Sequence, residues 1–306
     1  KVIWTVLKLA QALTVRHLTK ITDLTASDIH KVLVSQDVGC NRYYCSERKP
    51  QRNPSRFDQA MRQKTLLMFF SKPSLRTRVS FETGMTELGG HGIYYQFDVK
   101  LQKHKESLGD TARVVSRYVD VVMARVNDRS EIKELSENSA VPVINGLDDW
   151  AHPCQILTDL LTIKEKRNIK EVCLVFIGDC RNNVTYDLMR AAAVLGFTYG
   201  LLAMIRRMHA VGPHQPDEEV LHECAALVDA DVVYTDSWMS YGIPDAEKGQ
   251  ERRYKLFGAY RVTPKLMAKS SVNALFMHCL PVLCVFIEIQ ATRGAEVSAE
   301  VIDGPH

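Results

Sequence analysis

The segment 65–90 reads TLLMFFSKPSLRTRVSFETGMTELGG, and it joins two structural signals without a gap. Thr65–Phe70 is a short apolar run, which is typical of a strand buried on both faces. Residues 71–74 contain a proline and predict a turn. A helix is expected over 75–88, and the glycine pair that follows should end it. A strand, a turn and a helix in this order indicate an α/β fold.

The alternation of strand and helix signals continues along the rest of the chain. In the first half we expect further strands over 93–97, 121–124 and 141–144, and a helix over 110–119. In the second half we expect strands over 172–177, 201–205, 231–235 and 274–277, and helices over 183–195 and 217–227. Such alternation predicts an α/β protein of two domains, each a parallel sheet flanked by helices. Ligands of these sheets bind at the carboxyl ends of the strands.

Length and composition argue against a nucleic-acid-binding protein and a membrane protein. The chain has 306 residues, which suits two domains of about 150 residues each. The 39 basic and 36 acidic residues leave a net charge of +3, which argues against broad nucleic-acid binding. No apolar run reaches the roughly 20 residues that span a bilayer, so we expect no membrane segment. The eight cysteines are scattered, several of them inside apolar runs, which favours reduced thiols in an intracellular protein.

The start of the helix expected over 75–88 has the chemistry of an anion site. Unpaired N–H groups and the positive end of the helix dipole favour a phosphate there. Ser74 and Thr77 add hydroxyl donors, and Arg76 can grip a phosphate with two parallel hydrogen bonds. The alternative is an ordinary N-cap serine beside solvated arginines.

Residues 69–90 resemble the phosphate-binding signature of the aspartate and ornithine carbamoyltransferase family, with Leu75 in place of the first Thr of its Ser-Thr-Arg-Thr-Arg motif. The sequence His152-Pro-Cys-Gln155 resembles the family motif His-Pro-x-Gln, and Arg125 matches an arginine that contacts the same ligand. The resemblance implies a carbamoyltransferase fold and a carbamoyl phosphate site. That site would consist of Ser74, Leu75, Arg76, Thr77, Arg125, His152, Gln155, Cys279 and Leu280.

Three segments of the second half resemble the amino-acid-binding half of the family. DCRNNV at 179–184 resembles Gly-Asp-x-x-Asn-Asn, and DSWMSYG at 236–242 resembles the ornithine loop Asp-x-Trp-x-Ser-Met-Gly, with Tyr241 where the family has Met. His278-Cys-Leu-Pro281 is the form that ornithine enzymes of the family carry, whereas aspartate enzymes have Pro in the position of Cys279. The resemblance implies ornithine binding by Asn183, Asp236, Ser240 and Tyr241.

The implied reaction transfers a carbamoyl group from carbamoyl phosphate to the side-chain amine of ornithine and yields citrulline and phosphate. A lysine-like amine has a pKa of about 10.4 and must lose a proton before it attacks. Asp236 and Cys279 are candidates to assist that loss. Fixed donors such as His152 and Thr77 would stabilise the charge that grows on the carbonyl oxygen. The expected catalytic residues are Arg125, His152, Asp236 and Cys279.

Each of these residues also has a plainer interpretation when it is taken alone. His152 would be an ordinary surface or core histidine, Asp236 a turn residue at a strand end, and Cys279 a small buried apolar residue. Two other functions stay open: a carbamoyltransferase for another amine, such as an acylated ornithine or a diamine, and a non-catalytic paralogue that binds carbamoyl phosphate or a partner subunit.

The resemblance also implies an organisation for the protein. It assigns 14–160 to carbamoyl phosphate binding and 165–306 to binding of the amino acid. It implies a homotrimer in which residues 103–107 of a neighbouring subunit help to complete the site, and it implies no metal and no organic cofactor. We expect a cytoplasmic enzyme, with the mitochondrial matrix as the alternative.

The chain departs from the family near its end. Residues 282–290, VLCVFIEIQ, are mostly apolar and have no counterpart in the family pattern. The sequence stops at His306, before the Ala-Glu-Asn-Arg segment and the final helix of the family. We therefore expect either a truncated or mis-spliced sequence or a crippled copy, with reduced stability and activity of the chain as written.

Overall fold

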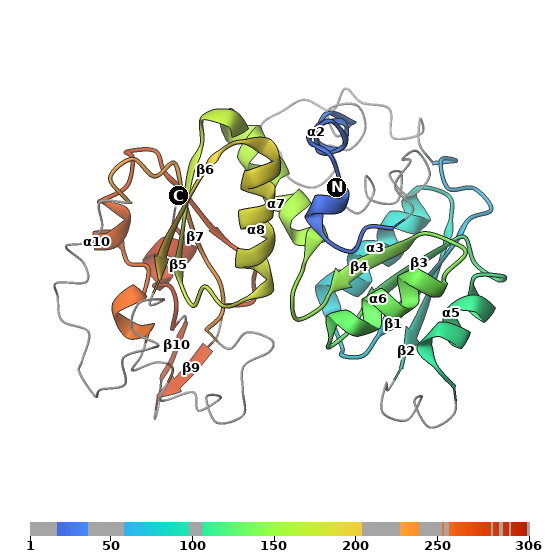
Figure 1. Ribbon diagram of the computed structural model, residues 1–306. Helices are drawn as coiled ribbons and strands as arrows, with labels where there is room; N and C mark the ends of the chain where they lie inside the picture. Colours follow the sequence, from blue (N-terminus) through green and yellow to red (C-terminus); the bar gives the residue numbers. More distant parts are fainter. Residues whose placement is uncertain are drawn as a thin grey trace. The chain divides into compact units, whose positions relative to one another are not determined.

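The computed structural model describes residues 17–35, 58–97, 106–203, 227–238, 253, 257–282, 284–287, 290–293 and 295–304. The chain divides into two compact units (Figure 1), a first unit of Lys1–Glu165 and a second of Lys166–His306. No helix in the described parts is long and apolar enough to cross a membrane.

The first unit contains a four-stranded parallel sheet in the order β2-β1-β3-β4. Its strands are β1 (Thr65–Phe70), β2 (His91–Gln96), β3 (Val121–Arg125) and β4 (Val143–Leu147). Its helices are η1 (Ile21–Asp23), α2 (Ala26–Ser35), α3 (Leu75–Glu87), α5 (Leu108–Val115), α6 (Arg129–Asn138) and α7 (Pro153–Lys166). Strands β1, β3 and β4 are buried almost throughout, whereas most residues of the edge strand β2 are exposed.

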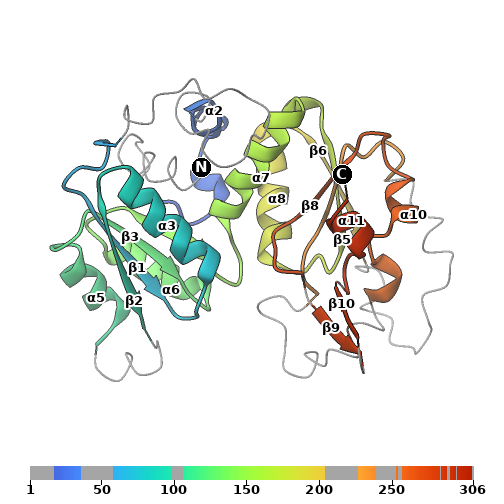
Figure 2. The ribbon, with the colours of Figure 1, turned by 180° about the vertical axis from the view of Figure 1, so that it is seen from behind.

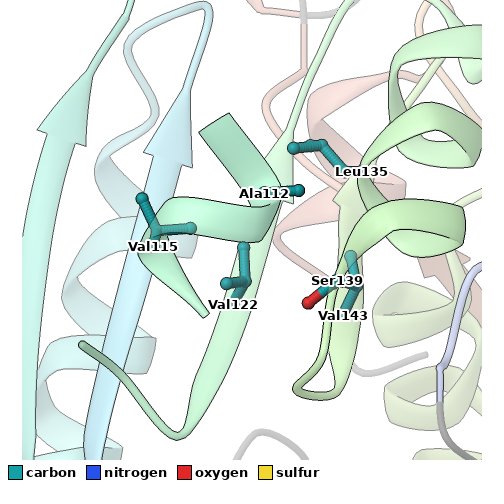
Figure 3. Close-up of a pocket in the computed structure, with 6 residues that line it drawn as sticks. All are labelled: Ala112, Val115, Val122, Leu135, Ser139 and Val143. Atoms are coloured by element: carbon teal, nitrogen blue, oxygen red, sulfur yellow. The ribbon is translucent and has the colours of Figure 1, made fainter. Parts of the chain in front are cut away.

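Helices cover both faces of this sheet. Figures 1 and 2 show α5 and α6 on one face and α3 on the other. Alternate residues of β1 and β3 pack against Ala112 of α5 and Leu135 of α6. Between these two helices, β3 and β4 lies a small apolar pocket (Figure 3), which has no room for a water molecule and is therefore part of the core packing.

The second unit repeats the same topology, with a parallel sheet in the order β6-β5-β7-β8. Its strands are β5 (Cys173–Gly178), β6 (Thr198–Ala203), β7 (Val232–Thr235) and β8 (Leu275–His278). Its helices are η4 (Ile169–Glu171), α8 (Asn183–Leu195), η9 (Gly258–Tyr260), α10 (Pro264–Met267) and α11 (Ala299–Ile302). Val175 and Val233 pack with Leu266 of α10 and Val301 of α11, so α10 and α11 cover one face of the sheet, and α8 lies on the other (Figure 2).

Five of the described residues between 282 and 290, Cys284–Ile287 and Gln290, belong to a separate two-stranded sheet. Strand β9 (Cys284–Ile287) pairs antiparallel with β10 (Gln290–Arg293), with Cys284 opposite Arg293. Most of the described inserted residues therefore build the first strand of a hairpin, which is drawn at the lower edge of the second unit in Figure 1. A two-stranded ribbon of this kind has little stability of its own.

The two α/β sheets and their parallel pairing confirm the predicted fold class. Strand Thr65–Phe70 and helix Asn183–Leu195 have the predicted ends, while other elements are shifted by a few residues. Strand β2 begins earlier than predicted because the N–H of His91 already donates to the carbonyl of Lys64, and polar residues at its start hide this. The sequence analysis missed α2, α6 and α7. Most of the helix expected over 217–227 lies outside the described residues.

Candidate active site

The predicted site residues of each unit gather at one place in the sheet topology. In both sheets the strand order reverses at the central pair, β1 with β3 in the first unit and β5 with β7 in the second. Loops that leave the carboxyl ends of such a pair diverge and open a crevice for ligands. The loop before α3 and Arg125 lie at the first of these points, and the 179–183 segment and Asp236 lie at the second.

The start of α3 has the features of an anion site. Ser74 occupies the N-cap position, yet its hydroxyl makes no capping hydrogen bond, unlike the caps of α5, α6 and α8. The N-cap serine interpretation is therefore not supported by a cap bond. Leu75 is 76% exposed, so its side chain contributes nothing to the core.

The two arginines of the loop have different surroundings. Arg78 pairs with Glu82 at 3.0 Å and stacks 3.8 Å from the centre of the Tyr94 ring. Arg76 is exposed, and among the described residues it has no ion pair. Arg76 is thus the arginine of this loop that an anion can reach, and its role in phosphate binding stays a prediction.

Arg125 connects the loop to the neighbouring strands. It ends β3 in register with Phe70 of β1 and Leu147 of β4. Its carbonyl accepts the N–H of Ser71 at 2.9 Å, and its Nη1 donates to the Thr77 hydroxyl at 3.3 Å. The structure therefore joins Thr77 and Arg125, two of the predicted ligands of carbamoyl phosphate.

His152 lies in the loop between β4 and α7. Burial of its ring, reinforced by the positive charge of Arg125, lowers the pKa of His152 to about 3. The imidazole is therefore neutral at physiological pH, and a neutral ring can donate to a carbonyl oxygen without adding a charge to the site. The effect of Arg125 on this pKa shows that the two side chains lie close enough to interact.

Asp148, which the sequence analysis did not single out, shapes the loop before His152. One of its carboxylate oxygens accepts the N–H groups of Trp150 at 2.7 Å and Ala151 at 2.6 Å, and the other accepts the Asn145 amide at 2.9 Å. Burial raises the pKa of Asp148 to about 6, although these hydrogen bonds oppose the shift.

Gln155 lies on the first turn of α7, and a buried partner sets its orientation. Its Nε2 donates to Asp159 at 2.9 Å, and its backbone N–H donates to the His152 carbonyl at 3.0 Å. With the nitrogen directed at Asp159, the amide oxygen is the atom that can accept from a ligand N–H.

In the second unit, Asp236 and Cys279 form a hydrogen-bonded pair. Asp236 follows β7 and Cys279 follows β8, and these strands are neighbours in the sheet. The Cys279 thiol donates to Oδ1 of Asp236 at 2.8 Å, and the N–H of Ser237 donates to the same oxygen at 2.6 Å. Burial raises the pKa of Asp236 above its ordinary range, with the thiol hydrogen bond acting against it.

His278 links this pair to a buried glutamate. Its Nδ1 accepts the N–H of Leu280 at 2.8 Å, which leaves Nε2 facing Oε1 of Glu296 at 3.3 Å. The His278 and Glu296 side chains are 1% and 0% exposed. Because Nδ1 accepts, Nε2 carries the proton and donates to the glutamate. Leu280 itself has a φ of 54°, a left-handed backbone that the loop after His278 holds in place.

Asn183 is the first residue of α8, and its side chain is buried. The preceding Asn182 caps the helix, with its oxygen accepting the N–H of Thr185 at 2.7 Å and its nitrogen donating to the Asp179 carbonyl at 2.7 Å. These contacts fix the start of α8 at the carboxyl end of β5. Ser240, Tyr241 and residues 103–105 lie outside the described residues.

Sequence reasoning missed Glu296 and Arg253 as well as Asp148. Glu296 lies 18 positions beyond its partner His278, so no local motif links the two. Asp236, His278 and Cys279 each offer one potential ligand atom within 4.8 Å of the others. In this structure those atoms are engaged with one another, with Leu280 and with Glu296.

Comparison with known proteins gives the same division of the chain. Residues 16–165 match the carbamoyl-P binding domain of aspartate/ornithine carbamoyltransferases, and residues 170–306 match their Asp/Orn binding domain. A catabolic ornithine carbamoyltransferase of Halobacterium salinarum is 38% identical over 301 residues, covering 94% of this chain and 91% of that protein. An anabolic ornithine carbamoyltransferase of Pyrococcus furiosus is 42% identical over 262 residues, covering 79% and 77%.

A solved structure supports the same relationship. The X-ray structure of ornithine transcarbamoylase from Giardia lamblia matches with a TM-score of 0.71 and 35% identity, and covers 96% of this chain and 91% of that one. Two family models that together span nearly the whole sequence, and relatives well above 30% identity, establish the relationship. The chain belongs to the aspartate/ornithine carbamoyltransferase family.

Proposed function

We propose that this chain is an ornithine carbamoyltransferase, in which the first unit binds carbamoyl phosphate and the second binds ornithine. The observation that carries the proposal is the Asp236–Cys279 pair, 2.8 Å apart at the ends of β7 and β8. A half-buried carboxylate such as that of Asp236 is stabilised by a positive partner, and the α-ammonium of an amino acid supplies one. The ornithine carbamoyltransferases among its relatives support this choice of acceptor.

The first unit would bind the carbamoyl donor as follows. The N–H groups at the start of α3, with Ser74, Leu75, Arg76 and Thr77, would hold the phosphate. Arg125 and neutral His152 would donate to the carbamoyl oxygen, and the Gln155 oxygen would accept from the carbamoyl nitrogen. Donors that are fixed before the reaction stabilise the oxyanion without reorganisation.

In the second unit, Asp236 would pair with the α-ammonium of ornithine, and Asn183, Ser240 and Tyr241 would complete the amino-acid site. The Leu280 carbonyl and Cys279 would contact the carbamoyl group. The neutral side-chain amine would attack the carbamoyl carbon, a C–N bond would form, and the C–O bond to phosphate would break. The amine proton would leave through the Asp236–Cys279 pair.

We further propose that the protein is a homotrimer. The support in this structure is the edge strand β2, whose apolar side chains Ile93 and Tyr95 are 40% and 48% exposed. An edge strand with exposed apolar side chains is usually covered in a native assembly. Sedimentation equilibrium should give three times the 34.6 kDa chain mass, and a monomer would contradict this proposal.

We propose a role in arginine metabolism, in arginine biosynthesis or the urea cycle, and a cytoplasmic location, with the mitochondrial matrix as the alternative. Cys154, Cys173, Cys180 and Cys279 are free thiols, which agrees with a reducing compartment. Fractionation of the source cells with an antibody against the chain would test the location.

A panel of amines tests the acceptor. The full chain should carbamoylate ornithine and should fail with N-acetylornithine, which lacks the α-ammonium that Asp236 would bind. Putrescine, which lacks the carboxylate, and aspartate, which lacks a side-chain amine, should also be poor acceptors. Faster turnover of putrescine or N-acetylornithine than of ornithine would contradict the proposal, and carbamoyl phosphate binding without any product would favour a non-catalytic paralogue.

A further inference from the structure

Arg253 is a buried arginine outside every predicted motif. Its side chain is 2% exposed. Its Nε donates to the carbonyl of Trp238, and its Nη2 donates to the carboxylate of Asp179, whose side chain is 3% exposed. Burying a guanidinium is costly unless its donors are satisfied, so this side chain is held by defined contacts rather than by general packing.

The two partners of Arg253 belong to the two segments that carry the proposed amino-acid ligands. Trp238 lies two residues after Asp236 at the end of β7. Asp179 precedes α8, its carboxylate accepts the N–H of Arg181 at 3.1 Å, and its carbonyl accepts the amide of Asn182 at 2.7 Å. One guanidinium therefore connects the segment of Asp236 with the start of the helix that begins at Asn183.

Aromatic packing leaves little freedom around this connection. The Trp238 and Phe257 rings are 5.8 Å apart, and Cζ of Arg253 lies 5.1 Å from the centre of the Phe257 ring. A Cβ atom on Gly178, which has a φ of +113°, would lie 2.9 Å from Nε1 of Trp238. The glycine thus lets the indole approach β5 closely, and the guanidinium holds the indole's own backbone in that position.

We propose that Arg253 is a positioning residue for the amino-acid acceptor, which sets the separation of Asp236 and Asn183 through its bonds to Trp238 and Asp179. The inference rests on the proposed function. Lysine cannot take this role, because one ammonium group lacks the planar fork that reaches a carbonyl and a carboxylate at once. Both hydrogen bonds reach segments that carry proposed ornithine ligands, so a change at Arg253 should alter ornithine binding and not carbamoyl phosphate binding.

The test is the steady-state kinetics of full-length Arg253→Lys, well below its melting temperature. We expect the KM for ornithine to rise by about 10- to 100-fold, the range for losing a hydrogen bond to a charged group, and the KM for carbamoyl phosphate to stay within about twofold. Arg190→Lys is the matched control, because Arg190 forms an ion pair of 2.7 Å with Asp187 inside α8. It should leave both KM values unchanged.

A second pair of measurements separates positioning from simple stability. In a double-mutant cycle with Asp179→Asn, the fold increase in the ornithine KM of the double variant should be much smaller than the product of the two single increases. Both changes break the same connection, so their effects should not multiply. If Arg253→Lys does not fold, Phe257→Leu replaces it. That change weakens the contact beneath the guanidinium and should raise the ornithine KM by about threefold to tenfold.

The outcomes are distinguishable. A wild-type chain that makes no citrulline overturns the proposed function itself. A wild-type chain that turns over, with Arg253→Lys melting earlier but keeping its ornithine KM, overturns the positioning role alone. An equal rise in both KM values, or a rise of the same size in Arg190→Lys, also overturns it.

Discussion

The change Thr77→Val removes one hydroxyl from the anion site and leaves the shape of the side chain almost unchanged. In the free protein this hydroxyl accepts from Nη1 of Arg125 at 3.3 Å, near the long limit of a hydrogen bond. Valine and threonine have similar helix propensities, so α3 itself should not be weakened. The structure therefore predicts a small effect on folding and a large one on the ligand.

The magnitudes follow from what each bond joins. A long, partly solvated hydrogen bond contributes at most about 0.5 kcal/mol, so the free energy of unfolding should change by no more than that. A hydroxyl that donates to a phosphate or carbamoyl oxygen contributes about 1.5–3 kcal/mol, which corresponds to about 10- to 150-fold in affinity. A large loss of ligand affinity beside a small loss of stability would show that Thr77 acts in binding.

The assay is calorimetric titration of carbamoyl phosphate, or of phosphate where the donor hydrolyses, together with urea denaturation of the same samples. Thr86→Val is the matched control, because Thr86 is exposed on the same helix and, among the described residues, its hydroxyl bonds only to the Glu82 carbonyl at 3.0 Å. A loss of affinity below about threefold, or equal losses in both variants, would refute the reasoning.

Three further predictions concern other parts of the protein. Cys279→Ser keeps a donor to Asp236 but removes the thiol, and kcat for citrulline formation should fall about 10- to 100-fold at saturating substrates; an unchanged kcat would remove Cys279 from the proton path. A carboxyl group whose pKa is raised in the folded state makes the protein more stable as pH falls through that pKa. The pKa of Asp148 is raised to about 6, so above pH 6 its ionisation should lower the free energy of unfolding by about 3 kcal/mol, and by progressively less toward pH 4. The free energy of unfolding in urea should therefore differ less between pH 5 and pH 8 in Asp148→Asn than in the wild type. An equal difference in both proteins would contradict the raised pKa of Asp148. Deleting residues 282–290 removes strand β9 and should raise both the melting temperature and kcat; a lower melting temperature would show instead that the hairpin stabilises the second unit.

The parts of the fold that could be predicted are those written in contiguous sequence. The run TLLMFF and the helix after it carry their own signals, as does the glycine that ends α8, so β1 and α8 were located to the residue. Helices α6 and α7 were missed because polar residues and the His-Pro motif at their starts resemble loop sequence. Residues 282–290 stood out as an apolar stretch, but strand β9 could not be given a partner from the sequence, since pairing depends on contacts made in the folded chain.

The residues of the candidate site also differ in whether neighbouring sequence could reveal them. Arg76 could be named from its place at a helix start, whereas Arg125 and Asp236 were named from the family resemblance; all three follow parallel strands, whose carboxyl ends are where ligands bind. Glu296 and Arg253 could not, because their partners are 18 and 74 positions away and each contact exists only in the folded chain. The neutral state of His152 was equally inaccessible, since it depends on burial and on Arg125.

The central claim is that this chain transfers a carbamoyl group to ornithine, and the most direct test counts both products. Full-length protein is incubated with carbamoyl phosphate labelled in the carbamoyl carbon, with and without ornithine, and labelled citrulline and phosphate are quantified. After subtraction of the phosphate that forms without protein, we predict equal amounts of the two products, formed only when ornithine is present. Phosphate released without labelled citrulline, or bound carbamoyl phosphate with neither product, would contradict it.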